Sequence, residues 1–397
     1  MYSLKRLVIH LAATTLLLGQ MLSATAASND DIEREFNVQP GGGLILNSDS
    51  GSIEVRTWSE ARVRVVVRNP GNFEVSIEQS GNEIIVQADR ERGRSRIRFE
   101  IQVPDEFDVE LDTGGGGITI EDISGNILAE TSGGNITIGT VLVGNVSVDT
   151  SGGSIVIDDV SDGNITAETS GGRITINNVN GDVFADTSGG NIIVGDVTGD
   201  VLAETSGGNI TVGDISGDVE LDTSGGTIRS GYASGTLTAE TSGGNIYLAG
   251  SDSFIDADTS GGNITIIRSG GPVIAHTSGG NIIIGPVQGF IEADTSGGSI
   301  KAELGNIEGR QNSHVDLNSS GGDIELLIPA SHRADVSVRI EVSRRARGDY
   351  RIYTDFPLTI SGQDERVVIG RGEINGGGDT INIETTNGDI RIISTDN

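Results

Sequence analysis

The chain has 397 residues, a formal net charge of −31, 60 glycines and no cysteine, and only 4% of its residues are aromatic. So many glycines with so few aromatics are not typical of a helical bundle or of an enzyme with an aromatic-rich core. Without cysteine the chain can form no disulfide framework and offers no cysteine for a lipid anchor. The composition favours an acidic all-β protein with many tight turns around a narrow aliphatic interior.

The first 26 residues are typical of a secretory signal peptide. Lys5 and Arg6 supply the positive start, residues 7–18 form the apolar run, and Ala-Thr-Ala at 24–26 provides a small-residue cleavage site. The apolar run is too short to cross a bilayer. We therefore expect a secreted, periplasmic or cell-surface protein with no transmembrane segment after cleavage. Cleavage would remove two bases and no acids, so 57 acids against 24 bases give an expected mature charge of −33.

Residues 27–110 are expected to form a β-rich N-terminal cap without internal repeats. Short apolar segments between turn residues predict strands near residues 44–46, 52–55, 63–67, 73–77, 84–86 and 97–101. A stack of coils leaves bare strand edges and an apolar surface at each end, so a cap with larger residues is expected there.

Residues 111–328 repeat the pattern Thr-Ser-Gly-Gly about every 18 residues. Ten copies begin at Thr131, Thr150, Thr169, Thr187, Thr205, Thr223, Thr241, Thr259, Thr277 and Thr295. A period this short and regular predicts a β-solenoid, in which each repeat forms one coil stacked on its neighbours.

Each repeat contains two predicted strands, one on either side of the glycine pair. Before the threonine, fixed apolar positions such as Ile127 and Ala129 flank a variable one such as Leu128. After the glycine pair, all ten copies place an isoleucine five residues beyond the threonine, as at Ile136. This period of two predicts strands with one buried and one solvated face.

Two further features complete the expected coil. The glycine pair is expected to turn the corner with dihedral angles that a side chain disfavours. A third apolar column is expected ten residues after the threonine, at Val141, Val160, Val179, Val197, Ile215 and Val287. The predicted fold is an all-β, single-stranded parallel β-solenoid of about 18 residues per coil, and we expect right-handed winding because parallel crossovers strongly prefer it.

Residues 329–397 are expected to form the C-terminal β cap. Residues 334–342 alternate as a strand, and residues 381–383 and 389–392 return to the pattern of the coils. No segment after the signal peptide predicts a helix.

The chain resembles the bacterial "putative adhesin" family, a family of unknown biochemical function, in four places. These are Phe-Asn-Val-Gln-Pro-Gly-Gly at 36–42, the strand at 51–55 with Trp58, the Thr-Ser-Gly-Gly-Asn-Ile units, and Thr-Asn-Gly-Asp-Ile at 386–390. The resemblance covers nearly the whole mature chain. It implies a repetitive β-solenoid and an adhesin-like structural or binding role without catalytic activity, and it brings no ligand residues with it.

A row of carboxylates is the sharpest candidate site. The residue before each repeat threonine is acidic in nine copies and His276 in the tenth, and the alternation places all of them on the outer face. The acidic members are Glu130, Asp149, Glu168, Asp186, Glu204, Asp222, Glu240, Asp258 and Asp294. Hard cations take carboxylate oxygens, so weak Ca²⁺ binding along this row is one hypothesis. The other is a solvated face that maintains solubility.

The other chemical motifs favour structure over reaction. The Gly-Gly-x-Gly-x-Asp nonapeptide of calcium-binding β-rolls is missing, and the three mature histidines are scattered without metal-ligand spacing. Asparagines four residues after the threonine are expected to form a hydrogen-bonded ladder at the corner. They are Asn135, Asn191, Asn209, Asn245, Asn263 and Asn281.

Two functions therefore remain open. The first is a structural or binding module of the cell envelope, with no cofactor, whose partner is an envelope glycan or a surface protein. The alternative is a carbohydrate-active β-helix enzyme, a lyase or hydrolase, for which acid pairs such as Asp158-Asp159 are candidates. So acidic a chain is not expected to bind nucleic acid.

Overall fold

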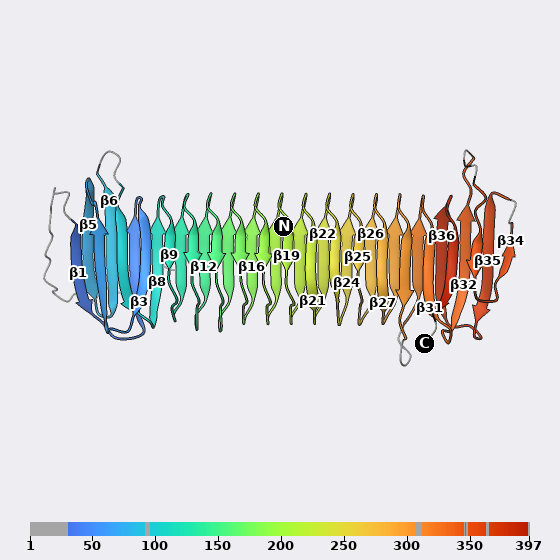
Figure 1. The fold of residues 1–397 in the computed structure, drawn as a ribbon, viewed down its shortest axis with the longest axis horizontal. Coiled ribbons are helices and arrows are strands. Elements are labelled where there is room, and N and C mark those ends of the chain that lie inside the picture. The colour runs from blue at the N-terminus through green and yellow to red at the C-terminus, as the bar shows by residue number, and fades with distance from the viewer. Residues whose placement is uncertain are drawn as a thin grey trace, which may run out of the picture.

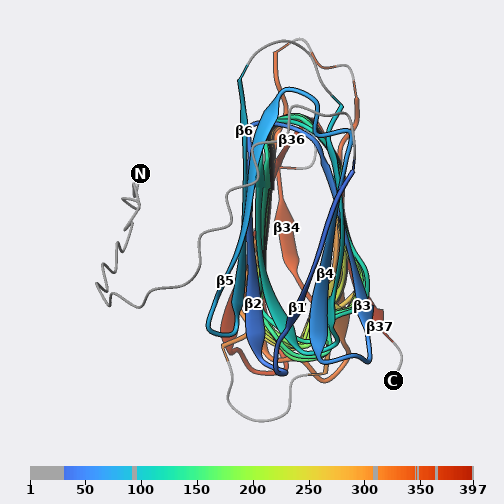
Figure 2. The same ribbon diagram turned by 90° about the vertical axis from the view of Figure 1, so that its left-hand side faces the viewer.

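The computed structural model describes residues 31–91, 96–306, 312–344, 346, 348–362 and 365–395, and the expected signal peptide lies outside these residues. Within the described ranges, 37 strands form two long sheets that face each other along a rod (Figures 1 and 2). The described part of the chain contains no helix long and apolar enough to cross a membrane.

One sheet, sheet A, contains the strands that follow the glycine corners. In spatial order it contains β1 (Ile32–Asn37), β4 (Arg62–Arg68), β7 (Arg98–Pro104), β3 (Ser52–Trp58), β9 (Ile118–Ile120), β11 (Ile136–Ile138), β13 (Ile155–Ile157), β15 (Ile174–Ile176), β17 (Ile192–Val194), β19 (Ile210–Val212), β21 (Ile228–Ala233), β23 (Ile246–Ser251), β25 (Ile264–Ile266), β27 (Ile282–Val287), β29 (Ile300–Leu304), β31 (Ile324–Pro329), β37 (Ile390–Thr395) and β33 (Ile352–Thr354).

The facing sheet, sheet B, contains the strands that end at the repeat threonines. In spatial order it contains β5 (Phe73–Ser80), β6 (Glu83–Arg90), β2 (Gly42–Ser48), β8 (Phe107–Thr113), β10 (Ile127–Thr131), β12 (Val146–Thr150), β14 (Ile165–Thr169), β16 (Val183–Thr187), β18 (Val201–Thr205), β20 (Val219–Thr223), β22 (Leu237–Thr241), β24 (Ile255–Thr259), β26 (Val273–Thr277), β28 (Ile291–Thr295), β30 (Val315–Ser319), β36 (Asp379–Thr386), β32 (Ala334–Glu341), β35 (Val367–Ile374) and β34 (Thr359–Ser361).

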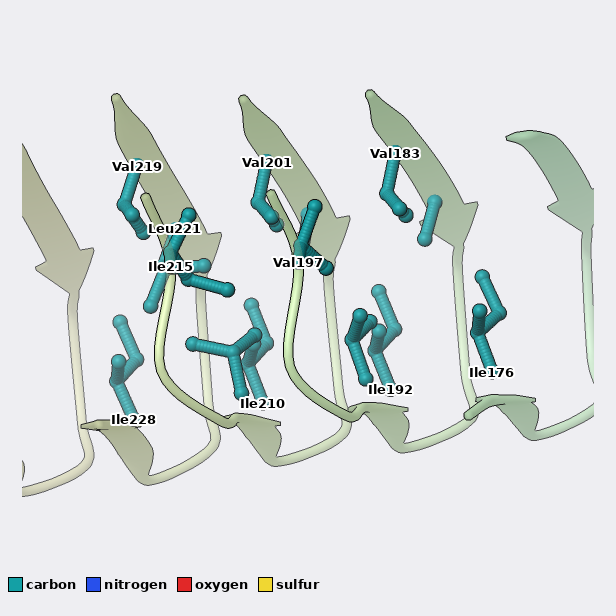
Figure 3. Packing of buried hydrophobic residues seen from close by; sticks show 14 of the residues in the cluster. Ile176, Val183, Ile192, Val197, Val201, Ile210, Ile215, Val219, Leu221 and Ile228 are labelled. Carbon is teal, nitrogen blue, oxygen red and sulfur yellow. The ribbon is translucent and has the colours of Figure 1, made fainter. Parts of the chain in front are cut away.

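The parallel solenoid predicted from the repeats is confirmed. Ile136 pairs with Ile155 and Ile155 with Ile174, so equivalent residues of successive coils lie side by side in parallel strands. The isoleucine column is fully buried between the sheets, and the third column from Val141 to Ile215 closes the interior through single parallel bridges (Figure 3). Because neither strand of a coil can bury its apolar face alone, stacking is what supplies the core.

The repeat threonine belongs to the interior and links each coil to the one before it. Thr223 is buried, its hydroxyl donates to the carbonyl oxygen of Gly208 (2.8 Å), and it accepts from the N–H of Gly226 (3.2 Å). The same pair of bonds recurs at Thr187 and Thr259. The hydroxyl thereby satisfies two backbone groups that strand pairing leaves over, and this is why valine does not replace threonine here.

The second glycine of each pair is required by close approach, and the expectation of special dihedral angles is wrong there. The second glycines of the repeats, from Gly134 to Gly298, do not have a positive φ. A Cβ on Gly208 would instead lie 1.8 Å from the carbonyl oxygen of Gly190, because corner rests directly on corner. At the first glycine, Gly207, the nearest atom would be 3.7 Å away, so the structure gives no steric reason for it.

Both ends of the rod depart from the order of the sequence. The coil of β2 and β3 lies between that of β6 and β7 and that of β8 and β9. Likewise β36 and β37 lie between the coil of β30 and β31 and the strands β32 and β33. Antiparallel strands finish sheet B at both ends, with β5 at one end and β35 and β34 at the other, and they finish sheet A at its N-terminal end with β4 and β1. At its other end, sheet A finishes with β33, which is parallel to β37.

Charged side chains cover the N-terminal edge. Ion pairs join β1 to β4, with Arg64 Nη2 2.6 Å from Glu33 Oε1 and Arg62 Nη1 3.0 Å from Glu35 Oε2. Charges on an exposed edge strand oppose pairing with another chain, so this end does not continue into a further coil.

The contact between successive corners predicts that alanine is far less tolerated at Gly208 than at its neighbour Gly207. Gly208→Ala should destabilise the protein by roughly 3 kcal/mol or more because the new methyl group meets backbone that cannot yield. Gly207→Ala, the matched control, should change stability by less than about 1 kcal/mol. Thermal unfolding followed by circular dichroism measures both, and equal melting temperatures for the two variants would contradict the corner account.

Candidate binding surfaces

The acidic row lies where the alternation placed it, on the outer face of sheet B. Strand registers align Glu204 with Asp186 on one side and Asp222 on the other, and the same alignment continues coil by coil. By register the acidic row continues to Asp112 before the first full repeat, whereas the neutral Asn318 occupies the equivalent position after the last. The sequence thus placed the row correctly and underestimated its length.

The carboxylates of the row repel one another. Burial, and then the charges of Asp186, Asp222 and Glu220, raise the pKa of Glu204. Burial, and then neighbouring carboxylates led by Asp222 and Asp258, raise the pKa of Glu240 in the same way. At a strand spacing of about 4.8 Å, two unit charges in water repel by roughly 0.9 kcal/mol. The row is therefore a surface under electrostatic strain at neutral pH.

Histidines interrupt this face near its C-terminal end. His276 occupies a position of the row, with its Nδ1 3.2 Å from Asp294 Oδ2. His314 stacks on Phe290 at 4.6 Å between ring centroids and bonds to Glu292 Oε1 through Nε2 (3.0 Å). Among the described residues, no three His, Asp or Glu side chains are grouped as ligands of one metal ion.

The expected asparagine ladder is present at the corners, with the backbone as its main partner. Asn245 Oδ1 accepts from the backbone N–H of Asn263 (2.7 Å), and Asn263 Oδ1 accepts from the N–H of Asn281 (2.8 Å). A direct bond between amide groups also joins Asn263 to Asn245 at 3.3 Å. Each side chain therefore ties its own coil to the next.

Aspartates do the same at the other turns. Asp218 Oδ1 accepts from the backbone N–H of Thr236 (2.7 Å) and from its hydroxyl (2.9 Å), and these bonds lower the pKa of Asp218. In the candidate acid pair, Asp159 accepts from the N–H of Asn178 (3.0 Å) and Asp158 accepts from Asn177 Nδ2 (3.2 Å). Both acids thus have structural partners in the next coil.

A groove follows the third side of the coils, and sequence reasoning missed it. Four successive triplets and a pair of residues from the fifth coil line this groove, which has a volume of about 670 Å³, and each triplet has a buried valine or isoleucine in its centre. The lining residues are Asp159–Ser161, Asn178–Asn180, Asp196–Thr198, Asp214–Ser216, and Tyr232 with Ser234. We call it the third-side groove. The signal in the sequence was Tyr232, which replaces the Asp or Asn found at that place in the four coils before it.

Comparison with known proteins identifies a family match. The model of the Toastrack DUF4097 family matches residues 44–275. No curated protein matches the chain.

Solved structures that resemble the chain do so at low identity. A putative cell adhesion protein from Clostridium sporogenes is 10% identical, with 92% of this chain and 100% of that chain covered and a TM-score of 0.15. A putative adhesin from Bacteroides fragilis is 13% identical over 93% and 99% of the two chains, with a TM-score of 0.21. A putative adhesin from Parabacteroides distasonis is 12% identical over 76% and 98%, with a TM-score of 0.23.

Carboxylates with a raised pKa and carboxylates with a lowered pKa should change the melting temperature in opposite directions when they are neutralised. A raised pKa in the folded state contributes stability at low pH that is lost as pH rises through the raised value, so Glu204→Gln and Glu240→Gln should raise the melting temperature at pH 7. Each gain should be below about 1 kcal/mol because these side chains are screened by solvent. The gain should vanish once pH falls below the ordinary carboxyl pKa of 4.5.

Asp218→Asn is the matched control for these two variants. Its lowered pKa means that the ionised form contributes stability above the ordinary pKa, so neutralisation should lower the melting temperature at pH 7. A pH series of melting curves measures all three variants. If Glu204→Gln melted at a lower temperature than the native protein at pH 7, repulsion along the row would not destabilise the folded state.

Proposed function

The chain belongs to the Toastrack DUF4097 family, and on that premise we propose that it is a non-catalytic, adhesin-like binding rod of the cell envelope. Its role is to hold long, regular faces toward other surface components. The protein acts outside the cytoplasm, as the signal sequence suggests, and its partner is an envelope glycan or a surface protein.

Continuity of the strand registers is the observation that supports this proposal. From β8 to β30, each strand of sheet B pairs in parallel with the next, and the aligned positions run from Thr113 through Thr205 to Ser319 without a shift. A stack of this kind presents the same surface position again and again along one direction. Repeat proteins use such extended surfaces for binding.

The outer positions are free to vary in a way that the inner ones are not. In sheet B the outer residue two before each row carboxylate changes from Leu128 to Ser147 to Thr166, while the inner neighbours stay aliphatic. Since exposed positions do not contribute to the core, they are available for recognition. This division suits a binding module better than a single reaction centre.

The acid pair that was the candidate for a carbohydrate-active enzyme is already hydrogen-bonded within the solenoid. Asp158 and Asp159 are engaged with the next coil, as described above. Glycoside hydrolysis needs two carboxyl groups that flank a bound sugar, one of them able to donate a proton. Two carboxylates contact Tyr232: its hydroxyl donates to Asp252 Oδ1 (2.6 Å) and its backbone N–H donates to Asp214 Oδ1 (2.7 Å). Both acids are thus engaged in hydrogen bonds within the coils, and this arrangement suits binding better than cleavage.

Envelope binding tests the proposal. Fluorescently labelled protein should bind isolated bacterial cell envelopes saturably, and unlabelled protein should compete, because the folded faces supply a finite number of contacts. Heat-unfolded protein of the same charge is the control and should not compete. A lack of saturable binding to envelopes of Gram-negative and Gram-positive bacteria would refute the proposal, and release of new sugar ends during incubation would favour the enzyme instead.

Weak Ca²⁺ binding by the acidic row stays a separate prediction. Neighbouring pairs such as Glu204 and Asp222 offer carboxylate oxygens, and a bound cation would relieve the repulsion between them. Calcium should then raise the melting temperature, and Glu204→Gln should reduce that rise. Equal melting temperatures in calcium and in chelator would remove this hypothesis.

A further inference from the structure

The third-side groove differs from the two sheet faces because it is a hollow lined by the turns of five coils. Its floor consists of the buried side chains Val160, Val179, Val197 and Ile215, which pair through single bridges from coil to coil. The polar residues before and after each floor residue form two rims. An aliphatic floor between polar rims is the usual composition of a site for a small organic ligand.

The first rim offers acceptors at regular intervals. In Asp196 and Asp214, Oδ1 accepts from the backbone of the next coil, at 2.8 Å in Asp196 and 2.7 Å in Asp214, and both side chains are exposed. The carboxylates are thereby held in place before any ligand arrives. Fixed polar groups favour binding because little side-chain entropy is lost when a ligand is bound.

The second rim offers hydroxyl and amide groups at the same interval. Thr198 Oγ1 donates to Asn180 Oδ1 (2.6 Å), and Asn180 Nδ2 donates to the carbonyl oxygen of Ser161 (2.9 Å). Ser216 and Ser234 continue this rim as exposed side chains. The interval between coils is about 4.8 Å, close to the length of one pyranose unit, so each coil can meet one sugar with the same set of groups.

Tyr232 ends the first rim with an aromatic ring that is held from two sides. Its hydroxyl donates to Asp252 Oδ1 (2.6 Å), and the Arg268 guanidinium lies 4.3 Å from the ring centroid. Burial and the bond to Asp252 raise the pKa of Tyr232, so the hydroxyl stays protonated. Because Arg268 covers one face of the ring and the hydroxyl proton is donated to Asp252, the ring offers a ligand its remaining apolar surface and its hydroxyl oxygen as an acceptor.

The charge of the lining decides between classes of glycan. Asp159, Asp196 and Asp214 line the groove, and its lining residues include no lysine or arginine. An anionic polysaccharide would place its charges beside these carboxylates and be repelled. The groove therefore suits a chain of uncharged sugars, whose hydroxyl groups donate to carboxylate and amide oxygens.

We propose that the third-side groove binds a linear neutral polysaccharide, which lies along the rod axis with about one sugar per coil and its end against Tyr232. This inference rests on the proposed function and names the ligand class and the surface. Five coils line the groove, so affinity should increase with chain length up to about five sugars.

Titration calorimetry with cellohexaose, xylohexaose, mannohexaose and hexa-N-acetylchitohexaose tests the proposal, with hexagalacturonate as the anionic probe. The native protein should bind at least one neutral hexasaccharide and bind its disaccharide more weakly. Ser216→Tyr fills the groove without altering a described side-chain hydrogen bond and should weaken binding by about tenfold or more. Tyr232→Ala should weaken binding by a similar factor.

Ser206→Tyr is the matched control, because Ser206 is exposed on the glycine corner, outside the groove lining. Its affinity should stay within about twofold of the native value. No binding of any neutral hexasaccharide, native affinity in Ser216→Tyr at unchanged melting temperature, or tighter binding of hexagalacturonate would each overturn the proposal. If Ser216→Tyr binds envelopes like the native protein, the groove assignment fails while the proposed function stands.

Discussion

Successive coils of this protein touch backbone to backbone, and that contact depends on one glycine and one threonine in each repeat. The second glycine has no room for a side chain because the preceding corner lies directly beneath it. The threonine hydroxyl then joins the two corners, as Thr223 does between Gly208 and Gly226. Since every coil must present the same corner to its neighbours, the repeat is strict at these positions and loose on the outer faces.

Much of this arrangement could be predicted from the sequence, because a period of two and a period of 18 are both local signals. The buried isoleucines, the third column and the outward position of the acidic row all follow from them. The reason for the glycines could not be predicted, because a close approach and an unusual dihedral angle select the same residue. The position of the β2–β3 coil between its two neighbours could not be predicted either. Its residues alternate like those of any other coil, and this pattern does not specify which strands pair with it.

The third-side groove shows a different limit of sequence reasoning. Its rims come from turn segments, where Asp, Asn, Ser and Thr are expected whether or not a ligand is bound. Only the change from Asp214 to Tyr232 at the same place in the coil marks the groove as different from an ordinary row of turns. The role of this change becomes apparent only from the structure, in which Asp252 and Arg268 hold the Tyr232 ring in place.

The intercalated ends set a condition on the order in which the rod can be completed. Strands β2 and β3 come early in the sequence, directly after β1, yet one side of their coil has no neighbour until β6 and β7 are present, and the other has none until β8 and β9 follow. At the far end, β36 and β37 follow β32 and β33 in the sequence, yet they fill the layer between those strands and the coil of β30 and β31. Neither end of the rod can therefore be assembled strand by strand in the order of the sequence. At both ends of the rod, therefore, a layer is completed only by strands that come later in the chain than the strands they pair with.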